Sequence, residues 1–289
     1  MMVLPVLGMV LVALIWGSVT LFSTWSGLPS PVFVFYRVAI ALPLVLVYAL
    51  NKRGGNALKF TWTSALSGTF LAFNWVFFFE AVSRVDISTA ALLYYFGPVF
   101  AVILSWILLK EEMRIIAWIP VVMAIAGILM IFFNSRVKTD SLGIIFGFLA
   151  GVSYGSLAVC GKAMGKKLAP EALVAQQLLI STIILSPFAF KGYHLTATAL
   201  LNAVVVGIIH TGLGLIIWFN VLRKIPMRVA SIFSYLDPIF ATFLAWVAFK
   251  QIPSFTTLIG GGLIIAAGVI VSNQYRSELK RVKTTVFEN

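Results

Sequence analysis

The sequence predicts an all-α integral membrane protein whose ten transmembrane helices form two inverted repeats of five helices. Three observations support this fold class. The first is composition: hydrophobic residues make up 61% of the 289 residues and charged residues 10%, and the mean hydropathy is +1.04. A typical soluble domain is about half apolar and about a quarter charged. The other two observations are a series of apolar runs and an internal repeat.

Ten apolar runs are separated by short polar connectors. Each run is long enough to cross roughly 30 Å of hydrocarbon as a helix. No connector is long enough to hold a soluble domain, so any chemistry belongs inside the helix bundle or at its ends. In chain order, we expect helices over residues 4–24, 31–50, 62–80, 87–109, 115–133, 141–161, 171–190, 198–220, 229–249 and 255–274.

The chain contains an internal repeat with an offset of 140 residues. The segment YFGPVFA at 95–101 returns as YLDPIFA at 235–241, and identities at the same offset extend from Phe79/Phe219 to Lys110/Lys250. Because each copy holds five helices, an odd number, the second copy crosses the membrane in the opposite orientation. Inverted repeats of this kind are typical of secondary transporters. We assign residues 1–134 to the first repeat and 135–289, with a short basic tail, to the second.

The formal net charge of +12 is distributed unevenly along the connectors. If the N-terminus is cytoplasmic, the connectors and tail on that side hold fifteen Lys and Arg residues, and the opposite connectors hold five. The positive-inside rule therefore places both termini in the cytoplasm, and the expected location is the cytoplasmic membrane of a prokaryote. Topology and contact with membrane lipids account for the positive charge, and no nucleic-acid partner is expected.

Several segments resemble the drug/metabolite transporter superfamily, EamA type. They are ALIWGS at 13–18, FYR at 35–37, the two helices that carry Pro98 and Pro238, and KEE at 110–112. The resemblance implies a central cavity lined by the third, fourth, eighth and ninth helices, with the first and sixth nearby. It also implies export of an amino acid or similar metabolite; uptake, or export of drugs and cations, is the alternative. The second repeat departs from the pattern, because KQI at 250–252 lacks the acidic pair.

Aromatic and polar residues on these helices are the candidate lining of the cavity. Cavities of this type recognise apolar or aromatic solutes by stacking and shape. The alternative for each aromatic residue is packing between helices or contact with lipid. The candidates are Trp16, Asn74, Trp75, Tyr94, Tyr95, Tyr154, His210, Trp218, Tyr235 and Asp237.

Two ionisable residues near one end of the bundle are candidate gate residues. Ionisable groups inside a bilayer are costly and need a partner or a function. Arg37 and Glu80 fall at similar depth near the outer ends of their helices, so we expect them to pair as an extracellular gate. The repeat maps them onto Gln176 and Asn220, which become the candidate cytoplasmic gate. A static ion pair is the alternative, and Arg37 is also suited to bind a substrate carboxylate.

His210 and Asp237 fall midway along the eighth and ninth helices. A titratable pair at the bilayer midplane suggests a proton relay and a coupling proton; a hydrogen bond between neighbouring helices is the alternative. Gly97 occupies the position that matches Asp237, so such a site is asymmetric. Pro98 and Pro238 match each other in mid-helix, where proline removes a hydrogen bond and bends the helix, and we interpret them as twin hinges.

An enzymatic alternative rests on the segment GVSYG at 151–155, which matches the pattern of a hydrolase nucleophile, with Ser153 as nucleophile and His210 as base. The match is inside an apolar helix, whereas a nucleophile elbow requires a turn from strand to helix. A single cysteine, Cys160, excludes an intramolecular disulfide and a thiolate-rich metal site. We therefore expect a transporter without metal or cofactor, monomeric or homodimeric, whose partners are a small-molecule substrate and lipids.

Overall fold

The computed structural model describes residues 3–85, 87–131, 140–165, 167–188, 193, 195–250 and 252–287. Within these ranges the chain is helical and contains no strand. Apolar residues dominate the helices, and a helix satisfies its backbone polar groups internally, as a hydrocarbon environment requires. The all-helical membrane fold expected from the sequence is confirmed.

The first half of the chain contains helices of very different length. Its longest members follow sequence signals: α3 has prolines at its start, and Thr61 caps α4 by accepting a hydrogen bond from the Ser64 backbone N–H. In chain order the elements are α1 (Val3–Gly17), α2 (Val19–Ser26), α3 (Ser30–Arg53), the 3₁₀ turn η1 (Gly54–Leu58), α4 (Trp62–Val82), α5 (Ile87–Tyr94), α6 (Gly97–Leu109), η2 (Ile115–Ala117) and α7 (Trp118–Ile131).

The second half begins with an N-cap, because the Asp140 side chain accepts a hydrogen bond from the Gly143 N–H. Its elements are α8 (Ser141–Met164), α9 (Pro170–Leu185), η3 (Ser186–Phe188), α10 (Ala197–Val205), the π-helical segment η4 (Val206–Leu213), α11 (Gly214–Leu222), α12 (Met227–Ser234), α13 (Leu236–Phe249) and α14 (Phe255–Phe287).

The described ranges contain nine helical spans that are long and apolar enough to cross a membrane. A shorter apolar helix, Ile115–Ile131, corresponds to the fifth expected span. The sequence expectation for that span continues to residue 133, and its last two residues lie outside the described part of the chain. The other spans agree within a few residues except at two ends: the second span continues through η1 to Leu58, and α14 continues beyond residue 274 to Phe287.

The two helices with matched prolines are broken at matched positions. The expected helix 87–109 is divided into α5 and α6 after Tyr94, and the expected helix 229–249 is divided into α12 and α13 at Tyr235. Pro98 and Pro238 lie in the first turn of the helix that follows each break. The first N–H groups of a helix have no intrahelical partner, so proline removes no hydrogen bond there. The expected kink is therefore a full break that both repeats share.

The repeats also make the same contact in inverted order. A Cβ added at Gly17 would lie 2.8 Å from the carbonyl oxygen of Asp237, and one added at Gly155 would lie 2.9 Å from the carbonyl oxygen of Gly97. Positions 97 and 237 are related by the repeat offset. Each glycine thus lets a helix of one repeat approach the backbone of the other, and the two approaches are related by pseudo-symmetry.

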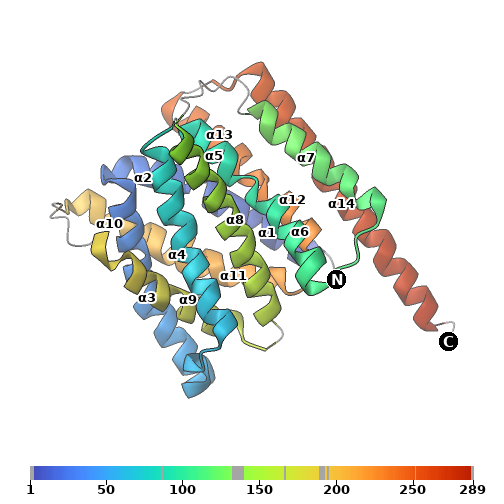
Figure 1. Ribbon diagram of the computed structural model, residues 1–289, viewed down its shortest axis with the longest axis horizontal. Coiled ribbons are helices and arrows are strands. Elements are labelled where there is room, and N and C mark those ends of the chain that lie inside the picture. Colours follow the sequence, from blue (N-terminus) through green and yellow to red (C-terminus); the bar gives the residue numbers. More distant parts are fainter. Residues whose placement is uncertain are drawn as a thin grey trace.

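The two repeats interdigitate instead of forming separate bundles. The helix α8 packs against α4, α5 and α6, the helix α9 packs against α3 and α4, and α1 packs against α13. At one edge of the molecule, α7 and α14 lie side by side (Figure 1). Because helices of both repeats alternate around the centre, a central cavity is enclosed by both.

The spanning helices alternate in direction, so the bundle has two ends. We call the end that holds the connector between α2 and α3 the Gly27 end. We call the opposite end, where α1 begins and α14 finishes, the Glu111 end, after the connector between α6 and η2. The charge distribution in the sequence predicts that the Glu111 end faces the cytoplasm.

Candidate functional site

A cavity of about 510 Å³ lies between the repeats. Its lining includes Thr24 near the end of α2, Phe33 in the first turn of α3 and Val82 at the end of α4, so it extends from the bundle centre to the Gly27 end. Sites for small molecules typically measure about 300–1,000 Å³. The cavity therefore suits a metabolite of modest size.

Nine of the ten candidate lining residues lie on this cavity. They are Trp16, Asn74, Trp75, Tyr94, Tyr95, Tyr154, His210, Trp218 and Asp237. The expectation for Tyr235 is wrong in this conformation, because its side chain is 1% exposed and packs in the apolar core. Its repeat counterpart Tyr95 lines the cavity. Because the second repeat is inverted, Tyr235 lies on the side of the bundle that the cavity does not reach.

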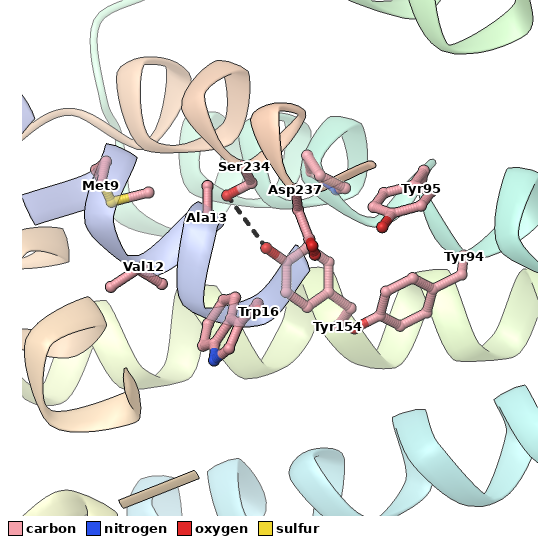
Figure 2. Close-up of a pocket in the computed structure, with 10 residues that line it drawn as sticks. Met9, Val12, Ala13, Trp16, Tyr94, Tyr95, Tyr154, Ser234 and Asp237 are labelled. Atoms are coloured by element: carbon pink, nitrogen blue, oxygen red, sulfur yellow. Dashed lines mark hydrogen bonds between the residues drawn. The ribbon is translucent and has the colours of Figure 1, made fainter. Parts of the chain in front are cut away.

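Four aromatic side chains form the inner wall of the cavity; we call Trp16, Tyr94, Tyr154 and Trp218 the aromatic floor. The rings of Tyr154 and Trp218 are stacked with centroids 6.0 Å apart. The Trp16 ring meets Trp218 edge-on at 5.4 Å, and the Tyr94 and Tyr154 centroids are also 5.4 Å apart. A recess of about 20 Å³, large enough for about one water molecule, extends beyond Tyr154 towards Ser234 (Figure 2).

Arg37 enters the cavity from α3. Its Nε donates a hydrogen bond to the Thr211 hydroxyl at 2.8 Å, and its guanidinium carbon lies 5.0 Å from the centroid of the Trp75 ring. The expected Arg37–Glu80 pair is absent from the described residues: the Glu80 carboxylate lies 3.8 Å from Arg84, four residues along the chain and just beyond the end of α4. The Glu80 side chain is 45% exposed, whereas Arg37 is buried. The two residues therefore differ in depth and do not form the expected gate.

The expected amide pair at the Glu111 end is also wrong. Gln176 is fully buried and donates to the backbone carbonyl of Ala57 at 2.9 Å, which fastens α9 to the turn η1. Asn220 instead accepts a hydrogen bond from Arg223, three residues away. The two amides therefore have separate partners: Gln176 joins α9 to η1, and Asn220 bonds within its own segment.

His210 lies in the π-helical segment η4 and faces α1 and α2. Its Nε2 is 2.8 Å from the Ser18 hydroxyl, at the break between those two helices, and its backbone carbonyl accepts a hydrogen bond from the Trp16 indole at 2.9 Å. Two irregular helices thus meet at this point. π-Helical turns often occur at functional sites. No sequence feature predicts the π-helix, so the sequence does not mark Ser18 and Thr211 as candidates.

Asp237 projects from the first turn of α13 into the cavity. Tyr95 donates a hydrogen bond to its carboxylate, and the side chain lies beside the Tyr154 ring (Figure 2). His210 and Asp237 therefore line one cavity without bonding to each other: His210 bonds Ser18, and Asp237 bonds Tyr95.

The structure does not bring Ser153 and His210, the residues of the hydrolase alternative, together. Ser153 is buried in the middle of the continuous helix α8, with no strand before it. It does not line the cavity that His210 lines, and His210 bonds Ser18 instead. The glycines around Ser153 serve packing, since a Cβ at Gly151 would lie 2.8 Å from the Leu93 carbonyl oxygen.

Charged residues from both repeats meet at the Glu111 end. One Glu111 oxygen lies 2.5 Å from the Lys162 ammonium on α8, and the other accepts a hydrogen bond from the Met227 N–H at 2.8 Å. Arg228 donates to the Glu112 carbonyl at 2.8 Å and forms an ion pair with Glu278. We call Glu111, Lys162, Arg228 and Glu278 the charged cluster.

The charged cluster lines a second hollow of about 650 Å³, which is distinct from the central cavity. The aromatic floor lies between the central cavity and this end of the bundle. The hollow and the central cavity share no lining residue; we therefore call the Gly27 end, which the cavity reaches, open and the Glu111 end closed.

Sequence comparisons give relatives along nearly the whole chain. The model of the EamA-like transporter family matches residues 3–133 and 141–273. An uncharacterized transporter of Bacillus subtilis, YxxF, is 29% identical over 83% of this chain and 80% of the relative. The pseudopaline exporter CntI of Pseudomonas aeruginosa is 24% identical over 86% and 87% of the two chains. The S-adenosylmethionine uptake transporter of Rickettsia bellii is 24% identical over 82% and 80%.

A solved crystal structure has the same fold, with a TM-score of 0.82 over 93% of this chain and 96% of that chain, at 19% identity. The family model matches both halves of the chain, in keeping with the duplicated helix breaks and glycine contacts. The chain belongs to the EamA-like transporter family.

Proposed function

We propose that this transporter exports a small organic metabolite, an amino acid or a similar apolar or aromatic solute, across the cytoplasmic membrane of a prokaryote. The observation that carries the proposal is the 510 Å³ cavity between the repeats, lined by nine of the candidate residues. Its aromatic walls offer stacking surfaces, and its few polar groups fix the orientation of a solute.

The proposed mechanism is alternating access. The repeats, assigned to residues 1–134 and 135–289, exchange conformations so that one end opens as the other closes. In this conformation the cavity reaches the Gly27 end, which the charge distribution places outside the cell. The matched breaks before Pro98 and Pro238 are the proposed hinges, since a helix break absorbs changes in backbone dihedral angles.

The gate that we propose for the closed end is the charged cluster. Glu111 belongs to the first repeat, and its partners Lys162 and Met227 belong to the second, so opening this end must separate them. In the sequence, the repeat aligns Glu111 with Gln251, a residue without a carboxylate. This asymmetry supports a resting state that is closed at the Glu111 end.

A coupling proton remains part of the proposal. His210 and Asp237 both line the cavity, and a titratable group in the substrate path can exchange a proton with either side. Transport into liposomes with and without a pH gradient separates coupled from uncoupled movement.

The test of the proposed function is transport by the purified protein in liposomes. Labelled amino acids, organic acids, nucleosides and cationic dyes are offered with and without a pH gradient. We expect movement of at least one amino acid that depends on the protein and saturates with concentration. Protein-free liposomes are the control. Movement of dyes or nucleosides alone contradicts the proposed substrate, and no movement of any solute contradicts the proposed function.

Uptake is the second candidate, favoured by the relative from Rickettsia bellii that is named as an uptake transporter. Direction is measured by loading the labelled solute inside or outside cells that express the protein. Faster loss of an internal solute supports export, and faster gain of an external solute supports uptake.

A further inference from the structure

Arg37 is a buried cation without a carboxylate partner in the described part of the chain. Arg37 is 8% exposed. Its Nε donates to the Thr211 hydroxyl, and its guanidinium carbon lies 5.0 Å from the centroid of the Trp75 ring. Thr211 is itself held by the Val206 carbonyl at 3.1 Å, within η4. The contact with Thr211 uses the Nε edge, and the residue lines the cavity. The terminal guanidinium nitrogens are left for a ligand.

Asp237 is the complementary case. Its carboxylate receives the Tyr95 hydrogen bond, and no Lys, Arg or His in the described ranges pairs with it. Tyr154 lies beside it in Figure 2, and Trp16 lines the same recess. An unpaired charge in a low-dielectric site costs several kcal/mol, and its retention in a membrane protein indicates a function.

The two charges line one cavity, yet they do not pair with each other. Arg37 belongs to α3 of the first repeat, and Asp237 belongs to α13 of the second. A solute that carries one carboxylate and one ammonium group satisfies both at once. The guanidinium binds a carboxylate through two parallel hydrogen bonds. The Asp237 carboxylate binds an ammonium group, and the neighbouring aromatic faces add cation–π attraction.

We infer that the cavity binds a zwitterion, with its carboxylate on Arg37, its ammonium on Asp237 and its apolar side chain against the aromatic walls. The inference rests on the proposed function, because it assigns the substrate class to the same cavity. It goes further in requiring both charges of the solute. A simple amine or a simple acid leaves one of the two protein charges unpaired and binds more weakly.

The test is a binding experiment with matched ligands and the purified full-length protein in detergent. Trp16, Trp75 and Trp218 line the cavity, so intrinsic fluorescence reports occupancy, and calorimetry gives the dissociation constant. The probes are leucine, phenylalanine and tryptophan, each compared with its decarboxylated amine and its deaminated acid. We expect at least one amino acid to bind about tenfold or more tightly than both of its analogues, since each lost charge removes a charge-assisted hydrogen bond.

Two variants assign the charges. In Arg37→Gln, we expect affinity for the amino acid to fall about tenfold or more and affinity for the amine to stay unchanged. In Asp237→Asn, we expect the same fall for the amino acid, with affinity for the acid unchanged. Glu80→Gln is the matched control, because Glu80 pairs with Arg84 outside the cavity, and all affinities are expected to stay at wild-type values. Size-exclusion profiles establish that each variant is folded.

The outcomes separate the inference from the proposed function. The zwitterion inference is overturned if no amino acid binds, if an amine or acid binds as tightly as its parent amino acid, or if the variants lower all affinities equally. Transport of a dye or nucleoside in that event leaves the transporter function standing. Conversely, zwitterion binding without flux in liposomes supports this inference and contradicts transport.

Discussion

At the residue scale, single side chains explain why the two repeats fit together. Gly17 and Gly155 occupy equivalent places where a helix of one repeat meets the backbone of the other. Their nearest neighbours are backbone atoms and a Cβ atom, which cannot rotate away as the end of a flexible side chain can. These positions are therefore more sensitive to added volume than glycines that face open space.

We predict that Gly17→Ala and Gly155→Ala each destabilise the protein by about 1–3 kcal/mol, because the new Cβ overpacks a close helix contact. Gly262→Ala is the control: no atom lies within 4 Å of its added Cβ, and replacing a mid-helix glycine by alanine is worth roughly 0.5–1 kcal/mol in favour of the helix. Thermal unfolding in detergent measures the difference. Equal midpoints in all three variants would contradict the close contacts.

Residue types in the sequence identified most of the cavity but not every partner. Trp75, Tyr154 and Asp237 were recognisable because they are polar or aromatic and lie on helices that the family resemblance places around the cavity. The pairing of Glu80 was not, because Arg84 satisfies it locally and sequence alone does not give side-chain depth. Thr211 carries no sequence signal of its own, since its role follows from the π-helical turn that presents it to Arg37.

At the element scale, broken helices set the geometry of the cavity. Tyr94 and Tyr95 face it from the break between α5 and α6, and Asp237 lies just after the break between α12 and α13. The prolines in the sequence predicted distortion at these two places. The breaks at Ser18 and in η4 had no such marker, and they depend on hydrogen bonds between helices that are far apart in sequence.

The prediction for the gate concerns Glu111, in the connector between α6 and η2, and its partner Lys162 on α8. Lys162→Met and Glu111→Gln each remove the ion pair that joins the two repeats at the Glu111 end, so we expect this end to open more often. Transport by either single variant should differ from wild type by about threefold or more, and the swap Glu111→Lys with Lys162→Glu should return it towards the wild-type rate. Initial rates in liposomes measure this effect.

Lys52 serves as the control for the gate variants. It is a half-exposed partner of Glu171 at the same end of the bundle, outside the charged cluster. Lys52→Met should transport at the wild-type rate, because exposed ion pairs contribute little. Equal transport rates in Lys162→Met and Lys52→Met would rule out the Glu111–Lys162 ion pair as a gate.

At the scale of the whole molecule, the inverted repeat explains one conformation and predicts another. Exchanging the conformations of the repeats would bring Tyr235, now in the core, to the position that Tyr95 occupies on the cavity. Composition, apolar runs and the repeat were sufficient to predict the helical membrane fold. They did not predict which end is open, because that depends on contacts such as Glu111–Lys162 that form only in the folded chain.

The central claim is that one cavity reaches alternate ends of the bundle, and cysteine labelling tests it most directly. Cys160 is the chain's single cysteine, so Cys160→Ala provides the background, with Ser23→Cys on the cavity and Ser254→Cys on an exposed connector at the same end. A membrane-impermeant maleimide is added outside intact cells. We predict that both positions are labelled, and that adding Lys162→Met slows labelling at position 23 about threefold or more without changing position 254. Labelling of position 23 from the cytoplasmic side alone, or at a rate unaffected by Lys162→Met, would contradict this account.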